Sequence, residues 1–230
     1  MDPLWRPLAR RPSAVLLAVQ LIGVLLYPFL DGPGGRALLS VFGILVLFLA
    51  VRTVQATPAL TWVAIGLGLP IVLLSAVEVI DPDNARVGLA TSILFAAFYG
   101  YTSYALIRYM FNDQVVTNDE LYATGATFTV VAWGFAYAYV AIAILQPGAF
   151  SGASDPTTPQ GWFEMLFLSF TNLTSVGLSD ILPVSPQARS IVMIEQVAGL
   201  LYIALVVSRV VGLTIVRQRE LQEESAGPDA

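Results

Sequence analysis

The sequence is dominated by apolar segments near the length that crosses a lipid bilayer. A helix needs about 20 apolar residues to cross the hydrocarbon core. Six segments come near this length: Ser13–Leu30, Ala37–Val54, Ala59–Ile80, Val87–Tyr109, Ala123–Leu145 and Arg189–Val216. A helix satisfies all its backbone hydrogen bonds within one segment, which the lipid interior requires. The pattern therefore predicts an all-α membrane protein with six transmembrane helices.

The composition agrees with a membrane location and excludes several kinds of chemistry. Hydrophobic residues make up 57% of the chain and charged residues 12%, whereas soluble domains are about 25% charged. The sequence contains neither Cys nor His. Catalysis by Ser–His or Cys–His pairs, Cys/His metal sites and disulfides are therefore excluded. We expect no enzymatic activity, no catalytic residues, no organic cofactor and no nucleic-acid partner.

The distribution of basic residues predicts how the chain crosses the membrane. Most Arg residues fall in the predicted tails and loops of one side, and this side is expected to be cytoplasmic. Arginine supplies all the basic residues, a usage that favours a GC-rich bacterial genome. We therefore expect a bacterial inner-membrane protein with cytoplasmic N- and C-termini. The residues on the predicted cytoplasmic side are Arg6, Arg10, Arg11, Arg52, Arg108, Arg217 and Arg219.

A shorter apolar piece, Trp162–Leu173, lies between the fifth and sixth spans. It is too short to cross the bilayer and is typical of a re-entrant helix. Start signals at 155–158 precede it, and Glu164 in its first turn suits the positive end of the helix dipole. The following loop, Thr174–Asp180, would then lie at membrane depth. Such backbone is tolerated only when buried in protein or lining a polar path.

The order of span, short helix, polar loop and span resembles the pore module of tetrameric potassium channels. The filter of that family reads TVGYGD, and the matching positions here are residues 175–180, SVGLSD, preceded by Thr174. The segment 181–183, ILP, resembles the usual exit from the filter. Glu195–Tyr202 resembles the inner helix of prokaryotic two-span modules. The resemblance extends from about Ala123 to Gly212.

The resemblance implies a passive cation channel made of four copies around one axis, a C4 homotetramer. In that family a ring of backbone carbonyls replaces the water shell of the ion. Bound K⁺, or Na⁺, would lie at Ser175, Val176 and Gly177, within an ion-binding set that runs from Thr174 through Leu178 and Ser179 to Asp180. Glu195, Thr171 and Asn172 are expected to support the filter. Gly199 is expected to be the gating hinge.

Two positions depart from the family filter. Leu178 replaces the family tyrosine and removes the hydroxyl that holds the diameter of the filter. Ser179 replaces the second family glycine, and serine is strained in a left-handed conformation. We therefore expect the inner ion sites to be kept, the outer ones to be altered, and selectivity between K⁺ and Na⁺ to differ from that of the family.

Two residues of the last span each allow two interpretations of their role. Glu195 lies about two turns into the span, where an ionisable side chain is costly. It either supports the filter from behind or pairs with another polar group. Gly199 is either a hinge or a point of close helix packing. Tyr139, on the fifth span, is expected to be a packing or belt residue rather than part of a ligand cage.

The chain divides into three predicted regions. Residues 1–122 form a four-helix N-terminal domain, 123–216 the pore domain and 217–230 a short cytoplasmic tail. The fourth span carries only Arg86 and Arg108, one near each end, whereas a voltage sensor repeats Arg within the span. The N-terminal domain is therefore either sensor-like without gating arginines or unrelated to a sensor.

Three alternatives to a potassium-type channel stay open. In the first, the loop VGLSD is an ordinary polar connection between two helices. In the second, the protein is a subunit of a Trk-like cation transporter, although those transporters carry four pore loops in one chain and only one is visible here. In the third, the filter is collapsed and the protein has a non-conducting, regulatory role. The partners expected in every case are membrane lipid and, in the channel, monovalent cations.

Overall fold

The computed structural model describes residues 12–29, 42–43, 45–52, 61–111, 118–152 and 161–226, and these are almost entirely helical. Residues 42–43 and 45–52 are helical too. The remaining elements, in chain order, are α2 (Pro12–Leu26), the 3-10 turn η1 (Tyr27–Phe29), α4 (Thr61–Ile80), α5 (Ala85–Met110), α6 (Asn118–Leu145), β1 (Phe150–Ser151), α7 (Trp162–Leu173), β2 (Leu182–Pro183) and α8 (Pro186–Ala226).

Within these described ranges, 5 helices are long and apolar enough to cross a membrane. They are Pro12–Phe29, Thr61–Ile80, Ala85–Met110, Tyr122–Leu145 and Pro186–Arg209. These helices correspond to five of the six predicted spans. The other predicted span, 37–54, lies partly outside the described residues, so the total of six spans stays a prediction.

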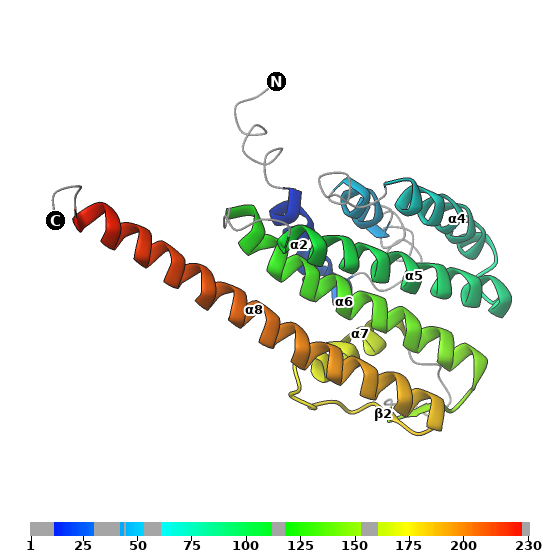
Figure 1. Ribbon diagram of the computed structural model, residues 1–230. Helices are drawn as coiled ribbons and strands as arrows, with labels where there is room; N and C mark the ends of the chain where they lie inside the picture. The colour runs from blue at the N-terminus through cyan, green and yellow to red at the C-terminus, as the bar shows by residue number, and fades with distance from the viewer. Residues whose placement is uncertain are drawn as a thin grey trace.

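Helix α6 lies at the centre of the molecule. α2, α5, α7 and α8 all contact it, and α4 packs on α5. A first core joins α2, α4, α5 and α6 and includes Leu16, Phe98 and Trp133. A second core, which includes Tyr139, Phe150 and Ile181, lies between α6, α7 and the beginning of α8. Helix α7 contributes to both cores, with Leu166 in the first and with Met165 and Leu168 in the second, and it lies beside α6 and the beginning of α8 (Figure 1).

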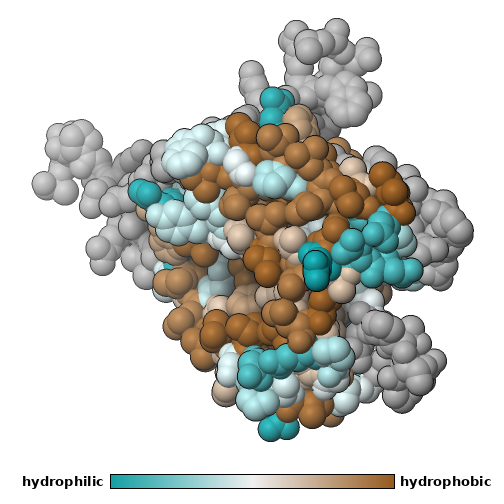
Figure 2. Space-filling view, turned by 90° about the vertical axis from the view of Figure 1, so that its right-hand side faces the viewer, coloured by the Kyte–Doolittle hydropathy of each residue, from teal (hydrophilic) through white to brown (hydrophobic). Residues whose placement is uncertain are grey.

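The outer surface carries apolar side chains along whole helices. On α4, Trp62, Ile65, Leu69 and Leu73 are all exposed at the spacing of one helix face. Figure 2 shows a broad hydrophobic region across one side of the molecule, with hydrophilic residues in smaller groups around it. A surface of this kind is stable against lipid tails and unfavourable in water. The protein is therefore embedded in a membrane.

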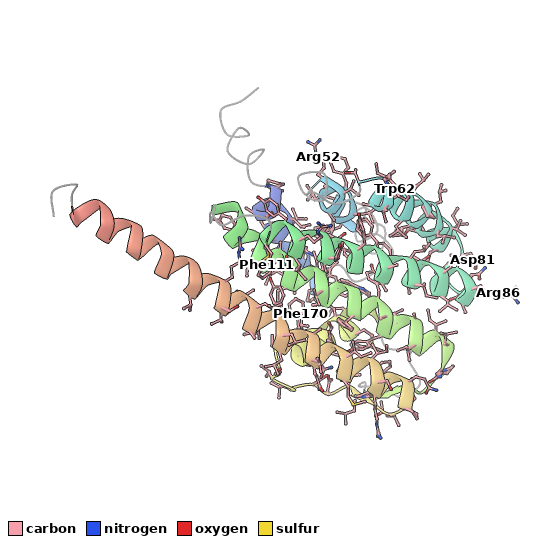
Figure 3. The ribbon with its side chains drawn as sticks, in the orientation of Figure 1. Arg52, Trp62, Asp81, Arg86, Phe111 and Phe170 are labelled. Atoms are coloured by element: carbon pink, nitrogen blue, oxygen red, sulfur yellow. The ribbon has the colours of Figure 1, made fainter. Side chains whose placement is uncertain are left out.

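Charged residues mark the ends of α5 rather than its middle. Arg86 lies at its first turn and Arg108 in its last turn. Asn84 begins the helix, because its side-chain oxygen accepts a hydrogen bond from the Val87 amide at 3.3 Å. Figure 3 places Phe111 at the other end, and the Arg209 guanidinium of α8 lies 5.2 Å from its ring centroid. The end of α5 therefore contacts the last helix directly.

Helix α8 is the longest element, with 41 residues. It passes through the predicted end of the sixth span and continues to Ala226, into the segment predicted as a tail. In Figure 1 it runs along α6 and then projects beyond the other helices.

Candidate functional site

The re-entrant helix α7 has the bounds that the sequence predicts, Trp162 to Leu173. Its beginning is stabilised by Glu164, whose carboxylate accepts a hydrogen bond from the Gly161 amide at 2.9 Å. This bond satisfies an amide just before the first turn, and the carboxylate also suits the positive end of the helix dipole. The predicted start signals at 155–158 lie outside the described residues.

The loop after α7 folds back onto the end of the helix. The Ser175 amide donates to the Asn172 carbonyl, and the amides of Val176 and Gly177 both donate to the Thr171 carbonyl, each at 3.0 Å. These bonds satisfy carbonyls that a helix end would otherwise leave without partners. Thr171 and Asn172, which the sequence marks as filter support, thus contact the loop through their main-chain oxygens.

The hydroxyls of the two threonines in this region point back to the helix. Thr171 Oγ1 lies 2.9 Å from the Leu168 carbonyl, and Thr174 Oγ1 lies 2.7 Å from the Phe170 carbonyl. Hydroxyls bound in this way compete with the regular helix bonds near a helix end. Both hydroxyls donate to the helix rather than to the loop.

The backbone of the loop alternates in handedness over its inner half. Ser175 has φ 60° and Gly177 has φ 68°, whereas Val176 between them has no positive φ. Ser175 is the one residue other than glycine with positive φ in the described part of the chain. A left-handed conformation costs a residue with a Cβ about 1–2 kcal/mol. The strain expected at Ser179 is therefore found at Ser175, and that expectation was wrong in its position.

The outer half of the loop is organised differently. Ser179 uses its side chain, and its Oγ accepts a hydrogen bond from the Ile181 amide at 3.1 Å. The side chain of Leu178 is 74% exposed in the single chain. Asp180 is exposed as well, whereas Ile181 is buried in the second core. Leu178 therefore makes no buried contact that would tether the loop within one chain.

Glu195 lies behind α7 and is completely buried in the single chain. Its carboxylate accepts hydrogen bonds from Tyr139 of α6 and from Ser169 of α7. The Ser169 oxygen also lies 2.8 Å from the carbonyl oxygen of Ala132. A buried carboxylate is tolerated when donors surround it. Glu195 thus joins three helices, so it does pair with polar groups. Tyr139, expected to be a packing residue, supplies one of those groups.

Gly199 lies one helical turn after Glu195 and also faces α7. A Cβ at this position would lie 2.1 Å from the carbonyl oxygen of Leu173 and 2.9 Å from its carbonyl carbon. Only glycine allows two backbones to approach so closely. Helix α8 continues without interruption through this position. The structure therefore shows a close contact at Gly199, and the hinge stays a prediction.

The sequence alone did not identify three residues of this site. Tyr139 carries no motif, and Ser169 resembles only the hydroxyl-rich end of a pore helix, a pattern that does not indicate a bond to Glu195. Gly152 lies in the long connection before α7, and its importance depends on a contact with Asp180. Only the pairing of distant segments brings these residues to the site.

Comparison of the sequence with known protein families gives one match. Residues 125–215 match a family model described as ion channel, and the matched segment begins in α6 and ends in α8. No curated protein and no solved structure matched the chain. The match covers less than half of the chain and shows that this segment is similar to the ion-channel domains that the model describes. With its apolar helices, the chain is a membrane-embedded protein with a segment similar to an ion-channel domain.

Proposed function

We propose that the protein is a potassium-conducting cation channel in which four identical chains surround one pore. The observation that carries this proposal is the alternating handedness at Ser175, Val176 and Gly177, directly after a re-entrant helix. Alternation of this kind turns successive carbonyls toward the same side of the strand. Four such loops around one axis would supply the carbonyl oxygens that replace the water shell of an ion.

The exposure of the loop in a single chain supports assembly. Val176 is 67% exposed although it follows a buried helix end. Leu178, two residues further along, is 74% exposed, and two neighbouring apolar side chains form a surface that other chains can cover. In the proposed tetramer, neighbouring loops and inner helices cover Val176 and Leu178. Closed cyclic symmetry is the usual result when identical chains meet around a pore.

The proposed ion sites differ between the two halves of the loop. K⁺ is expected at the carbonyls of Ser175, Val176 and Gly177, with Thr174 at the inner end. Leu178 and Ser179 change the outer half, so we expect a ratio of K⁺ to Na⁺ permeability below that of a filter with the family tyrosine. Asp180 attracts cations to the outer mouth through its charge. The proposed membrane is the bacterial inner membrane, with both termini in the cytoplasm.

The experiment that tests the function is a reversal-potential measurement on the purified protein in a planar bilayer, with K⁺ on one side and Na⁺ on the other. A reversal displaced in the K⁺-selective direction supports the proposal. A reversal near zero shows a cation pore without selectivity. Silence at all voltages, beside a control channel that conducts, contradicts the channel and favours a non-conducting or transporter role.

Two glycine variants sharpen this measurement. Gly177 and Gly148 both have positive φ, 68° and 83°, and neither has an atom within 4 Å of an added Cβ. Replacement of either by Ala therefore adds similar backbone strain without a clash. Gly177→Ala is expected to abolish or alter conduction, whereas Gly148→Ala should conduct as the wild type does. Equal currents from both variants would contradict the assignment of the ion sites.

A further inference from the structure

The segment before the re-entrant helix is paired with the segment after the filter loop. β1 and β2 form a two-stranded antiparallel sheet. Next to it, the Ala149 carbonyl accepts hydrogen bonds from the Val184 amide at 2.8 Å and from the Ser185 amide at 3.2 Å. The two connections that flank α7 and the filter are therefore joined through their backbones.

Gly152, directly after β1, lies against the end of the filter loop. Its φ is +107°, and a Cβ added there would lie 1.8 Å from the carbonyl oxygen of Asp180 and 2.9 Å from its carbonyl carbon. Real Cβ atoms essentially never approach backbone within 3.0 Å. Gly152 is thus the residue that allows the connection to pass directly over the Asp180 peptide.

Ser179 holds the same peptide from the other side. Its hydroxyl oxygen accepts the Ile181 amide hydrogen bond, so the chain turns around Asp180. Ile181 is buried next to Phe150 of β1 in the second core. The Phe150 ring in turn lies 5.4 Å from the Tyr139 ring, at 62° to it. This contact links the outer end of the loop to the tyrosine that donates to Glu195.

We infer that Gly152 and Ser179 are positioning residues that fix the outer end of the filter. In this chain they replace the tether that a filter tyrosine would supply, since Leu178 offers no hydroxyl. The inference rests on the proposed function, because it assigns a purpose to the contact within a conducting pore. Gly152 sets the position of the Asp180 carbonyl, and Ser179 sets the direction in which the chain leaves the filter.

The first test compares Gly152→Ala with Gly148→Ala in the bilayer assay. Both glycines are exposed and have positive φ on the same connection, but Gly148 has no atom within 4 Å of an added Cβ. Gly152→Ala is expected to change the K⁺/Na⁺ permeability ratio by about fivefold or more, as strain of about 1 kcal/mol would. Gly148→Ala should leave the ratio unchanged. An unchanged ratio in Gly152→Ala, or equal changes in both, overturns the inference.

The second test uses the side chain of Ser179. Ser179→Ala removes the acceptor of the Ile181 amide, whereas Ser179→Thr keeps a hydroxyl at the same position. The alanine variant is expected to shift the permeability ratio in the same direction as Gly152→Ala, and the threonine variant to restore the wild-type ratio. Loss of selectivity in both variants, or in neither, contradicts a role of the hydroxyl.

A measurement without current separates this inference from the proposed function. Hydrogen–deuterium exchange of the peptide 178–185 in the solubilised full-length protein reports whether the outer end of the loop is held. Gly152→Ala and Ser179→Ala should each raise its exchange rate, and Gly148→Ala should not. If the wild-type protein is silent but exchange follows this pattern, the channel proposal fails and the positioning contact stands. Unchanged exchange in both variants overturns the contact itself.

Discussion

At the scale of single residues, Glu195 explains how the pore helix is held. A carboxylate buried at membrane depth is costly unless donors satisfy it. Tyr139 and Ser169 supply these donors from two other helices. The three side chains come from α6, α7 and α8, so these hydrogen bonds connect α7 with both of the long helices beside it.

The hydrogen bond between Tyr139 and Glu195 can be measured by a double-mutant cycle. Tyr139→Phe removes the donor with little change of shape, and Glu195→Gln keeps the volume but not the charge. Each variant should lower the thermal stability of the protein in detergent, and the two effects should be non-additive by about 1 kcal/mol. Melting curves of the four proteins give the coupling. Because the amide oxygen of glutamine can still accept the bond, additive effects would show that the charge of Glu195 adds nothing to its interaction with Tyr139.

Gly199 permits a test that distinguishes its two readings. Gly199→Ala places a methyl group against the Leu173 carbonyl, so the close-contact reading predicts a loss of about 1–3 kcal/mol of stability from overpacking. The hinge reading predicts normal stability with fewer open channels. Melting temperature and open probability, measured on one preparation, separate the two.

Gly100→Ala is the matched control for this substitution. Gly100 lies in helix α5 and has no atom within 4 Å of an added Cβ. Alanine is favoured over glycine in a helix by about 0.5–1 kcal/mol, so this variant should be as stable as the wild type or slightly more stable. If Gly100→Ala were as damaging as Gly199→Ala, the contact with Leu173 would not be the cause.

At the scale of elements, aromatic contacts connect the beginning of α7 with the N-terminal helices. The Tyr27 ring in η1 stacks on Phe163 with centroids 4.4 Å apart and planes at 7°. The centroid of the Trp162 ring lies 5.8 Å from that of the Tyr27 ring and 5.1 Å from that of the Trp133 ring of α6. The first span thereby contacts the pore helix without any charged residue.

The aromatic contact predicts that Tyr27 contributes to the stability of the pore region. Tyr27→Ala removes the stacked pair with Phe163, worth about 0.5–1.5 kcal/mol beyond the area it buries. Phe29→Ala is the control, because Phe29 lies in the same turn but is 82% exposed. Limited proteolysis of α7 should be faster in Tyr27→Ala than in Phe29→Ala. Equal rates would show that the stack does not hold the helix.

The elements differ in how well the sequence predicts them. The bounds of α7 and the existence of the five described spans follow from apolar length and turn residues, which act locally. The beginning of α6 at Asn118 and the end of α8 at Ala226 were not predicted, because polar residues continue both helices beyond their apolar segments. The left-handed residue Ser175 could not be predicted, because its conformation depends on hydrogen bonds between the loop and the end of α7. The β1–β2 pair and the Gly152 contact join segments about 30 residues apart, and no local pattern encodes such pairing.

At the scale of the whole molecule, α8 leaves an apolar face exposed in the single chain. Val197, Leu200 and Leu201 are each more than half exposed on the helix that follows the loop. Lipid can cover some of this face. The part next to the exposed loop is where neighbouring chains would pack in the proposed tetramer.

The number of chains in the assembled protein can be measured directly. Native mass spectrometry of the protein released from detergent or nanodiscs should show a species with four chains of 24.7 kDa each. The same species should persist in Gly148→Ala, because an added Cβ there meets no atom of its own chain within 4 Å. A dominant species with one or two chains would contradict the proposed symmetry and, with it, the ring of carbonyls.

The length of α8 turns small rotations near the filter into large displacements elsewhere. From Gly199 to Ala226 the helix extends about 40 Å at 1.5 Å per residue. A tilt of about 5° at the contact with Leu173 would therefore move the far end by about 3.5 Å, by the same geometry. In the proposed channel, a force applied near Ala226 would therefore be transmitted along α8 to its contact with Leu173, next to the proposed ion sites.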